Sequence, residues 1–216
     1  MSNSRTIFVV VDNESWLIPY AKKLVSEINK HNGKAVFCKE LKDISPGYIA
    51  FFLGCINIVP DNILKLNKYN LVVHESDLPN GRGFSPLTWS VLEGKNSVDI
   101  CLLDAGKEVD SGDVYLHQEI TLNGYELIDE LRSLQGETTI CMCLYFVENN
   151  TSIIKLKQEG EPTWYPRRGP KDSELDIKKT IAEQFNLLRV VDNDKYPAFF
   201  MLDDQKYVLK IEKVIS

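Results

Sequence analysis

Residues 71–83 read LVVHESDLPNGRG, and this stretch decides the fold. The apolar run from Leu71 to Val73 is typical of a short strand buried on both faces of a sheet. It leads directly into His74, and a Leu-Pro pair and a Gly-Arg-Gly loop then end the strand. Ligands of parallel sheets bind beyond the carboxyl ends of the strands. His74 is therefore predicted to lie at a ligand-binding edge.

Strands and helices alternate on both sides of this stretch. Strands are predicted at residues 6–11, 35–38, 49–53, 71–73, 98–103 and 114–120. Helices are predicted from just after Asp12-Asn13 to about His31, and at residues 63–66, 85–93 and 122–147, the last weakened near Gly136. This alternation predicts an α/β fold with a doubly wound, mostly parallel, Rossmann-like sheet and right-handed crossovers.

The C-terminal part of the chain has a different pattern. Glycines, prolines and arginines favour a loop at residues 159–170. A helix is predicted at residues 173–190, with Ile177, Ile181, Phe185 and Leu188 on one face. Residues 198–202 and 207–211 are predicted to form a hairpin. We therefore expect a small extension, made of a loop, a helix and a hairpin, beyond the central sheet.

Composition limits the classes of function. The chain has 216 residues and a formal net charge of -6, so no general affinity for nucleic acid is expected. It contains five cysteines without zinc-type spacing, which we interpret as reduced core thiols of a cytoplasmic protein and not as a metal site. A signal peptide is not expected, because no basic segment followed by a long apolar run opens the chain. The longest apolar stretch, residues 139–147, is too short to cross a membrane.

A carboxylate follows another predicted strand. Asp110 lies in the turn VDSGD, residues 109–113, beyond the strand at residues 98–103. An imidazole and a carboxylate at two strand ends can meet at one edge of a sheet, which is one way to build a general base. The ordinary pKa of an imidazole, about 6.5, suits such work at neutral pH. Taken alone, Asp110 could be a turn former and His74 a hydrogen-bonded bystander.

These residues resemble the formyltransferase family, which uses 10-formyltetrahydrofolate. The family's first motif is a strand ending in Asn-x-His-x-Ser-Leu-Leu-Pro, followed by Arg-Gly, and its second is Leu-Asp-x-Gly-Asp. The residues that fit are His74, Ser76, Leu78, Pro79, Arg82, Gly83, Asp110, Gly112 and Asp113. Residues 162–176, 186–189 and 196–200 resemble sugar-nucleotide formyltransferases, so the resemblance covers roughly residues 48–211. The 12–16 stretch and the His74 motif are most similar to a short subclass of pseudaminic-acid and surface-glycan biosynthesis.

The resemblance implies a catalytic pair and two binding sites. His74 would be the base and proton carrier, and Asp110 would orient its ring. The residues implied for 10-formyltetrahydrofolate are Gly54, Cys55, Ile58, Val59, Leu103, Asp104, Gly106 and Val109. Those implied for a nucleotide-linked amino sugar are Ser76, Arg82, Gly83, Trp164, Tyr165, Arg167 and Arg168, with the last two gripping the diphosphate and an aromatic ring stacking on the base. Residues 1–150 would be the formyltransferase catalytic core and residues 151–216 the C-terminal extension.

Structural roles remain open for several of these side chains. Ser76 could cap its loop, and Arg82 could pair with Glu75 or Asp77. The two adjacent arginines could instead join an ion-pair cluster whose acidic members would be Asp172, Glu174 or Asp176. Trp16 and Trp89, near predicted helix starts, are expected to be core residues. The folate-site loops could be ordinary connections between elements.

One position departs from the family motif. The family's asparagine falls at position 72, where this chain has Val72. That asparagine shares the stabilisation of the reaction's oxyanion with the histidine, and loss of one such donor typically costs on the order of 10²–10³ in rate. Backbone amides, a water or protonated His74 would carry that task here. Asn70 shares the face of Val72 but lies about 7 Å further back along an extended strand.

The leading hypothesis is a cytoplasmic enzyme that transfers a formyl group from 10-formyltetrahydrofolate to the amine of a UDP-linked 4-amino-4,6-dideoxy sugar. A dTDP-linked 4-amino-4,6-dideoxyglucose is the alternative acceptor. Formylation of initiator methionyl-tRNA is disfavoured by the acidic charge and by the end of the chain shortly after its last hairpin. Because of Val72, a degenerate member that binds folate or a sugar nucleotide without chemistry is a third hypothesis. The C-terminal hairpin could close a homodimer interface.

Overall fold

A computed structural model describes residues 5–106 and 108–214 of the chain. Its centre is a six-stranded sheet in the order β2-β1-β3-β4-β6-β7. The strands are β1 (Thr6–Val10), β2 (Lys34–Cys38), β3 (Ile49–Phe52), β4 (Tyr69–His74), β6 (Ser97–Asp104) and β7 (Val114–Thr121). The first four pair in parallel, whereas β6 and β7 are antiparallel to their neighbours. The predicted α/β class with a mostly parallel sheet is confirmed.

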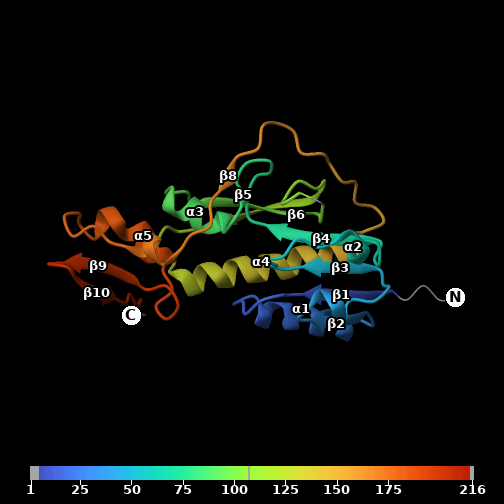
Figure 1. The fold of residues 1–216 in the computed structure, drawn as a ribbon. Coiled ribbons are helices and arrows are strands. Elements are labelled where there is room, and N and C mark those ends of the chain that lie inside the picture. The colour runs from blue at the N-terminus through green and yellow to red at the C-terminus, as the bar shows by residue number, and fades with distance from the viewer. Residues whose placement is uncertain (1–4, 107, 215–216) are drawn as a thin grey trace.

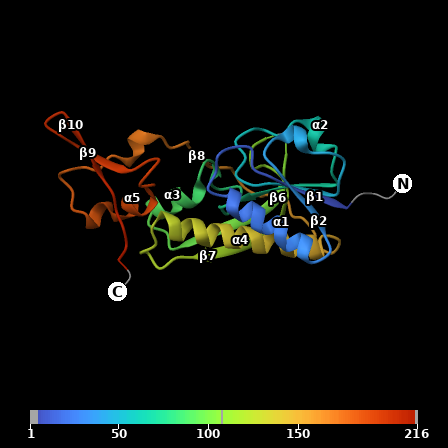
Figure 2. The same ribbon diagram turned by 90° about the horizontal axis from the view of Figure 1, so that it is seen from below.

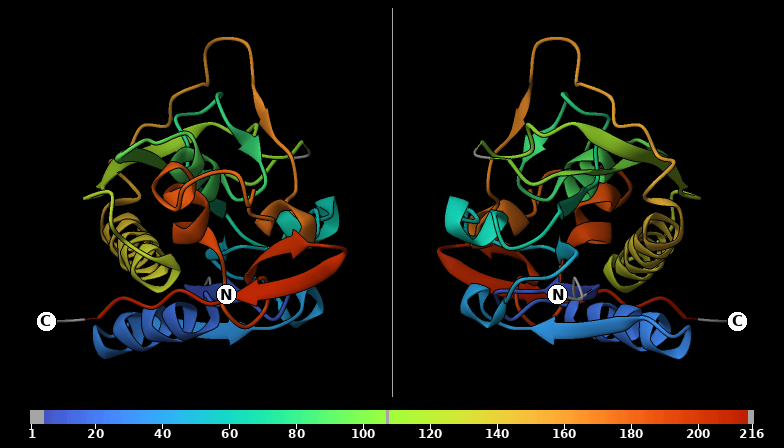
Figure 3. Two further views of the ribbon diagram at one scale, coloured as in Figure 1. Left: turned by 90° about the vertical axis from the view of Figure 1, so that its left-hand side faces the viewer. Right: turned by 90° about the vertical axis from the view of Figure 1, so that its right-hand side faces the viewer.

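Helices cover both faces of the sheet. Figure 2 shows α1 (Ile18–Lys30) and α4 (Ile128–Asn149) side by side on one face. The short helix α2 (Asp61–Leu64) and the 3₁₀ turn η1 (Leu41–Asp43) cover the other face. Two views along the strands, in Figure 3, show this layering from both ends of the molecule. Helix α1 buries an apolar stripe of Ala21, Leu24 and Ile28 against the sheet, as its 3.6-residue period requires, and α4 buries Leu131, Ile140, Met142, Cys143 and Phe146 there.

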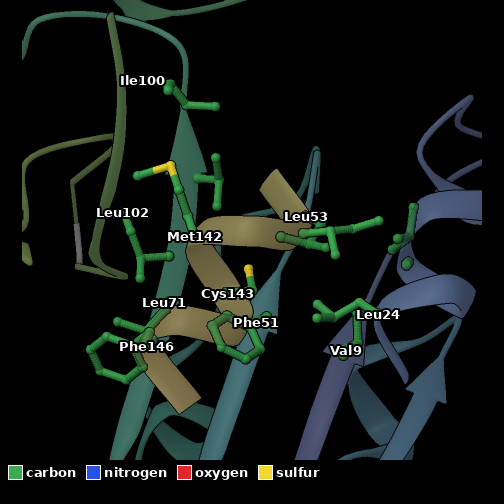
Figure 4. Packing of buried hydrophobic residues seen from close by; sticks show 14 of the residues in the cluster. Val9, Leu24, Phe51, Leu53, Leu71, Ile100, Leu102, Met142, Cys143 and Phe146 are labelled. Atoms are coloured by element: carbon green, nitrogen blue, oxygen red, sulfur yellow. The ribbon is translucent and has the colours of Figure 1, made fainter. Parts of the chain in front are cut away.

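The core lies between the sheet and helices α1 and α4 (Figure 4). Alternate residues of the strands point to this face, so Phe51 packs here while Phe52 packs on the opposite face. The rings of Phe51 and Phe146 meet edge to face with centroids 6.4 Å apart. Each fully buried side chain of this size contributes about 1.5–3 kcal/mol relative to an exposed one. This packing fixes the position of β4 and therefore the position of His74 at its end.

A long connection runs past the β7 edge of the sheet, where Leu156 bridges Val114, and continues toward the end of β4. After α4, residues 151–163 arch over the sheet as an extended connection, drawn in orange at the top of Figure 1. The connection leads into β8 (Trp164–Tyr165), which pairs in parallel with β5 (Arg82–Gly83). Helix α3 (Pro86–Leu92) follows β5. The segment that follows His74 is therefore held, through the pairing of β5 with β8, to the connection that comes from α4.

The predicted helix at residues 173–190 is wrong. The structure has 3₁₀ turns η2 (Pro170–Ser173) and η3 (Ala182–Gln184), and only the last turns form a helix, α5 (Phe185–Val190). Ile177 and Ile181, predicted on a buried face, are 55% and 58% exposed. Side chains in this segment bind backbone amides, as Asp176 does with that of Lys178, which competes with the helical ladder.

Three smaller predictions are also corrected. Helix α4 begins at Ile128 and not at residue 122, because Glu126 accepts hydrogen bonds from the backbone of Asn123 and Gly124 and holds a turn there. The hairpin pairs β9 (Ala198–Leu202) with β10 (Gln205–Leu209) across a turn of Asp203 and Asp204, both with positive φ, so β10 starts two residues earlier than predicted. The loop at residues 159–170 contains the short strand β8.

The five cysteines are all free. Cys38, Cys101 and Cys143 are buried as predicted, but Cys141 is exposed and Cys55 is half-buried in a loop. Burial raises the pKa of the Cys55 thiol to about 12, so this thiol stays protonated at neutral pH. Within residues 5–106 and 108–214, no helix is long and apolar enough to cross a membrane.

Candidate functional site

A cavity of about 720 Å³ opens beyond the carboxyl ends of β3 and β4. Its walls come from the loops after β3 and β6, from the segment before α1, from α4, and from the segment around β8. His74 and Asp110 both line it. The predicted edge of the sheet is thus the place where the chain leaves room for a ligand, as expected for an α/β sheet.

His74 is the last residue of β4 and is only 5% exposed. Its Nε2 lies 2.9 Å from the carbonyl oxygen of Gly81, which can only accept, so Nε2 carries a proton in this arrangement. Nδ1 lies 3.5 Å from Oδ2 of Asp110. In the neutral ring Nδ1 is then the nitrogen with the free lone pair, and a proton that it takes up meets the carboxylate.

Asp110 is held in place by backbone and side-chain contacts. Its Oδ2 accepts a hydrogen bond of 2.9 Å from the backbone N–H of Gly83, and its φ is +51°. Gln158, on the connection after α4, donates to the carbonyl oxygens of Asp110 and Gly112, each at 2.8 Å. The turn that carries the carboxylate is therefore fixed from two sides, and the carboxylate itself is directed at His74. Gln158 gave no sequence signal, because it belongs to no motif.

All eight residues predicted for the folate site line the cavity: Gly54, Cys55, Ile58, Val59, Leu103, Asp104, Gly106 and Val109. Their role in binding remains a prediction. Ile58 is 65% exposed and Val109 44% exposed, so apolar side chains face open space from both loops. Exposed apolar side chains of this kind are common in the walls of small-molecule sites.

The first of these loops is fastened by Asp12, which follows β1. The carboxylate accepts hydrogen bonds from the backbone N–H groups of Ile56 and Asn57 and from the side chain of Asn57. Burial alone would raise the pKa of Asp12, but these bonds and one from Asn13 outweigh it and hold the pKa below 3.8. Asp12 is therefore ionised at neutral pH and fixes the loop that walls one side of the cavity.

The second loop is fastened by Lys155. Its Nζ lies 2.6 Å from Oδ2 of Asp104 and 3.2 Å from Oδ2 of Asp113, the residues on either side of the loop. Hydrogen bonding to Asp104 raises the pKa of Lys155, which keeps the ammonium charged. Asp104, predicted as a folate contact, thus also anchors the base of its own loop. Neither Lys155 nor Asp12 was identified as functional from the sequence.

Val72 lines the cavity, at the position of the family's asparagine. Asn70 does not replace it, because its Nδ2 donates to the carbonyl of Leu64, away from the cavity. Within the described residues, the walls nearest His74 present backbone groups and the imidazole, but no side-chain amide on β4. Strand β4 therefore supplies no side-chain amide that could replace the family's asparagine as an oxyanion donor.

The β8 segment supplies another wall of the cavity. Trp164, Tyr165, Arg167 and Arg168 line the cavity, together with Gly83. The Tyr165 ring stacks on Trp89 with centroids 5.7 Å apart, and Trp89 does not line the cavity. Arg168 donates to the backbone carbonyl of Asp172 and not to its carboxylate, and its Nε is buried with no partner among the described residues. The ion-pair cluster considered for the two arginines is thus not formed by Arg168.

Two predicted substrate residues lie outside the cavity wall. Ser76 is buried, and Arg82 donates to Gln158 at 2.6 Å while its guanidinium lies 5.9 Å from the Trp164 ring centroid. Among the described residues, Arg82 forms an ion pair with neither Glu75 nor Asp77, and the Glu75 carboxylate accepts from Gln135 on α4. Arg82 instead ties β5 to the connection that holds Asp110.

A further part of the cavity wall was missed. Trp16, predicted as a core residue, lines the cavity with Arg132, Gln135, Asp192 and Glu75. Arg132 lies over the Trp16 ring at 5.8 Å from its centroid and pairs with Asp192 at 2.8 Å. These residues come from the segment before α1, from α4 and from the region after α5. Long-range pairing of this kind leaves no local pattern in the sequence.

No model of a known protein family matches the chain. The methionyl-tRNA formyltransferase of Malacoplasma penetrans is 26% identical over 182 residues, which are 82% of this chain and 56% of the relative. That of Clostridium novyi is 30% identical over 185 residues, 82% of this chain and 57% of the relative. These matches support the formyltransferase family. The chain spans about half the length of the curated relatives that it matches.

Solved structures show the formyltransferase fold. A methionyl-tRNA formyltransferase from Clostridium thermocellum has a TM-score of 0.81 at 21% identity, covering 98% of this chain and 94% of that one. A 4-N formyltransferase from Francisella tularensis has a TM-score of 0.69 at 19% identity, covering 99% and 100%. HypX from Aquifex aeolicus in complex with tetrahydrofolic acid has a TM-score of 0.75 at 15% identity, covering 97% of this chain and 38% of that one.

Proposed function

We propose that the chain is an N-formyltransferase that moves a formyl group from 10-formyltetrahydrofolate to a primary amine. The observation that carries the proposal is the buried His74–Asp110 pair in the wall of a cavity with apolar loops on one side. In this reaction the neutral amine nitrogen bonds to the formyl carbon, the bond from that carbon to the folate nitrogen breaks, the amine loses a proton, and the folate nitrogen gains one. The folate supplies the one-carbon group, and the cavity residues position it and handle the proton.

His74 is the group proposed to take that proton. Its Nδ1 is the free nitrogen of the neutral ring, and Asp110, 3.5 Å away, stabilises the positive charge that forms when Nδ1 is protonated. General acid–base help of this kind typically contributes about 10²–10⁴ in rate. The loops at residues 54–59 and 103–109 would hold the folate, and their anchors, Asp12 and Lys155, preserve the shape of that wall.

For the acceptor we propose an amine on a nucleotide-linked sugar. Arg167 and Arg168 line the cavity next to the rings of Trp164 and Tyr165, a combination suited to a diphosphate and a base. The buried, unpartnered Nε of Arg168 supports this assignment, because a phosphate oxygen would satisfy it. A UDP-linked 4-amino-4,6-dideoxy sugar of the pseudaminic-acid type is the first choice, and a dTDP-linked sugar is the second. We also propose the division into a core at residues 1–150 and an extension at residues 151–216.

A second candidate acceptor is initiator methionyl-tRNA. The sequence relatives act on methionyl-tRNA by their names, which favours it. The formal net charge of -6 disfavours it, because tRNA binding draws on a basic surface. Affinity for tRNA that falls steeply between 50 and 200 mM salt would support this candidate, as about a thousand-fold loss is typical of several phosphate contacts.

A single-turnover assay tests the proposal. Enzyme in excess is mixed with 10-formyltetrahydrofolate labelled in the formyl group and with a panel of UDP- and dTDP-linked amino sugars, or with initiator methionyl-tRNA. Label in an amide of one sugar identifies the acceptor. Label in methionyl-tRNA alone replaces the first candidate with the second. Binding of folate and of a sugar nucleotide without any label transfer would identify a member that binds without catalysing.

A further inference from the structure

Glu75 lies beside the proposed reaction centre, on the side opposite the folate loops. Val72 and His74 project toward the face of β4 that carries Cys55 and Val59, because side chains alternate along a strand. Glu75, the next residue after His74, therefore projects toward α4, where its Oε1 lies 2.5 Å from Nε2 of Gln135. The cavity extends to this side as well.

The carboxylate of Glu75 has only uncharged hydrogen-bond partners in the protein. It accepts from Gln135 and from its own backbone, and no Lys or Arg side chain among the described residues pairs with it. The nearest arginine of this wall, Arg132, is committed to Asp192 at 2.8 Å. Burial raises the pKa of Glu75, and the charge of His74 and the bond from Gln135 work against that rise. An enclosed carboxylate with room in front of it is stabilised by a cationic ligand.

The proposed acceptor carries such a cation. A primary amine on a sugar is an ammonium group in neutral water, and it must approach the formyl carbon next to His74. An acceptor that approaches His74 from the side opposite the folate loops would find the carboxylate of Glu75 on that side. The wall around it, made by Trp16, Arg132 and Gln135, has the aromatic and polar groups that a sugar ring contacts.

We propose that Glu75 is the residue that recognises the acceptor's amino group. The carboxylate accepts a charge-assisted hydrogen bond from the ammonium group and places the nitrogen beside His74. Gln135 holds the carboxylate in that orientation. The ammonium group loses one proton to solvent before the neutral amine attacks, and His74 takes the second proton after attack. This inference rests on the proposed N-formyl transfer, and it adds the residue by which the enzyme distinguishes an amine from the hydroxyl of a related sugar.

The test is the exchange Glu75→Gln, which keeps the size and the hydrogen bond to Gln135 but removes the charge. Binding of UDP- and dTDP-linked 4-amino-4,6-dideoxyhexoses is measured by titration calorimetry, each beside its congener with a hydroxyl in place of the amine. We expect Glu75→Gln to weaken binding of the amine about 10–100-fold, the range for a charged hydrogen bond, and to leave the hydroxyl congener and tetrahydrofolate within about twofold. The control Glu14→Gln removes a carboxylate that pairs with Lys39 at the surface and should change none of these affinities.

The outcomes separate this inference from the proposed function. Equal affinity of wild type and Glu75→Gln for the amine would show that Glu75 only ties β4 to α4, even if wild type formylates the sugar. Suppose that Glu75→Gln binds only the amino sugar more weakly, and that wild type shows no turnover. This result would support amine recognition by Glu75 and would contradict the catalytic proposal. If wild type binds neither sugar nucleotide, the sugar acceptor and its recognition by Glu75 are both wrong, whereas N-formyl transfer itself is decided by the single-turnover assay.

Discussion

The carboxylate of Asp110 lies 3.5 Å from Nδ1 of His74 and is fixed there by a 2.9 Å hydrogen bond from the backbone of Gly83. The other ring nitrogen of His74 faces the carbonyl oxygen of Gly81. Both contacts place acceptors beside the ring, so the orientation of the imidazole is fixed from two sides. The carboxylate of Asp110 is therefore in position to accept from Nδ1 when that nitrogen has taken up a proton.

Replacing Asp110 with Asn should lower the turnover number and leave the fold intact. The amide oxygen can still accept from Gly83, but the negative charge that stabilises protonated His74 is gone. We expect kcat to fall by about 10²–10⁴, the usual contribution of acid–base help. The check is kcat for the acceptor identified in the single-turnover panel, together with the melting temperature. Full activity in Asp110→Asn would exclude the pair from the mechanism.

Replacing His74 with Asn should abolish detectable turnover, because no other imidazole lines the cavity within the described residues. The chain offers a matched control. His117 and Asp99 form a second histidine–carboxylate pair, 2.9 Å apart, on the edge strand β7 and its neighbour β6. His117→Asn should keep the wild-type rate. Equal losses in the two variants would point to a general effect on the fold and would contradict the assignment of His74.

The central sheet and the position of His74 were predictable because their signals are local. Buried parallel strands read as apolar runs, and a histidine directly after such a run lies at the sheet edge. Asp110 follows β6, which is antiparallel to β4 with Asp104 opposite Leu71, so it is the loop after β6 that brings this carboxylate to His74. The helix predicted at residues 173–190 failed for a local reason too. The apolar period was real, but Thr180 and Glu183 form a reciprocal capping box, which starts the helical turns of η3 and α5 at that point and separates them from residues 173–179.

The rest of the site could not be predicted from the sequence, because it is built by contacts across the chain. Glu75 meets Gln135 and Asp12 meets Asn57, over separations of 60 and 45 residues. Gln158 reaches Asp110 from 48 residues away. None of these pairs has a characteristic spacing, and each residue alone is typical of a solvated surface. The positions that shape the cavity therefore became visible only in three dimensions.

Asp12→Asn should destabilise the protein in a pH-dependent way. The pKa of Asp12 is lower in the folded state than its ordinary 3.8, so its contribution is complete above about pH 3.8 and is lost as the pH falls through the folded value. We expect a loss of about 1–3 kcal/mol at pH 7, the range for hydrogen bonds to a charged group, and a smaller difference below pH 3.8. Urea unfolding at pH 7, 5 and 3.5 measures it.

The control for this series is Asp204→Asn, in the exposed turn between β9 and β10, where Asn also tolerates positive φ. Its unfolding free energy should follow that of wild type at every pH. A difference for Asp12→Asn that is as large at pH 3.5 as at pH 7 would mean that the charge of Asp12 is not what fastens the loop at residues 54–59.

Gly83→Ala should destabilise the strand pair β5–β8 and the site with it. Gly83 has φ of +103°, and a Cβ there would lie 2.5 Å from the carbonyl oxygen of Tyr165. We expect a loss of about 2–4 kcal/mol, from backbone strain and the steric clash together. Gly160→Ala isolates the strain, because φ is +112° there and the nearest atom to a Cβ is 3.7 Å away. Gly160→Ala should lower the free energy of unfolding by about 1–2 kcal/mol. Equal melting temperatures for the two variants would contradict the clash.

Val72→Asn tests what the missing oxyanion donor costs. Val72 lines the cavity on the face of β4 that leads to His74, so an amide at this position would point where the formyl oxygen gains charge. We expect kcat to rise by up to about 10², since one such donor is typically worth 10²–10³ in rate. Val72→Leu, which adds volume but no donor, should not raise it. Single-turnover rates at saturating folate and acceptor separate the chemical step from binding. An unchanged or lower rate in Val72→Asn, with tetrahydrofolate binding intact, would mean that a backbone amide or protonated His74 already stabilises the oxyanion fully.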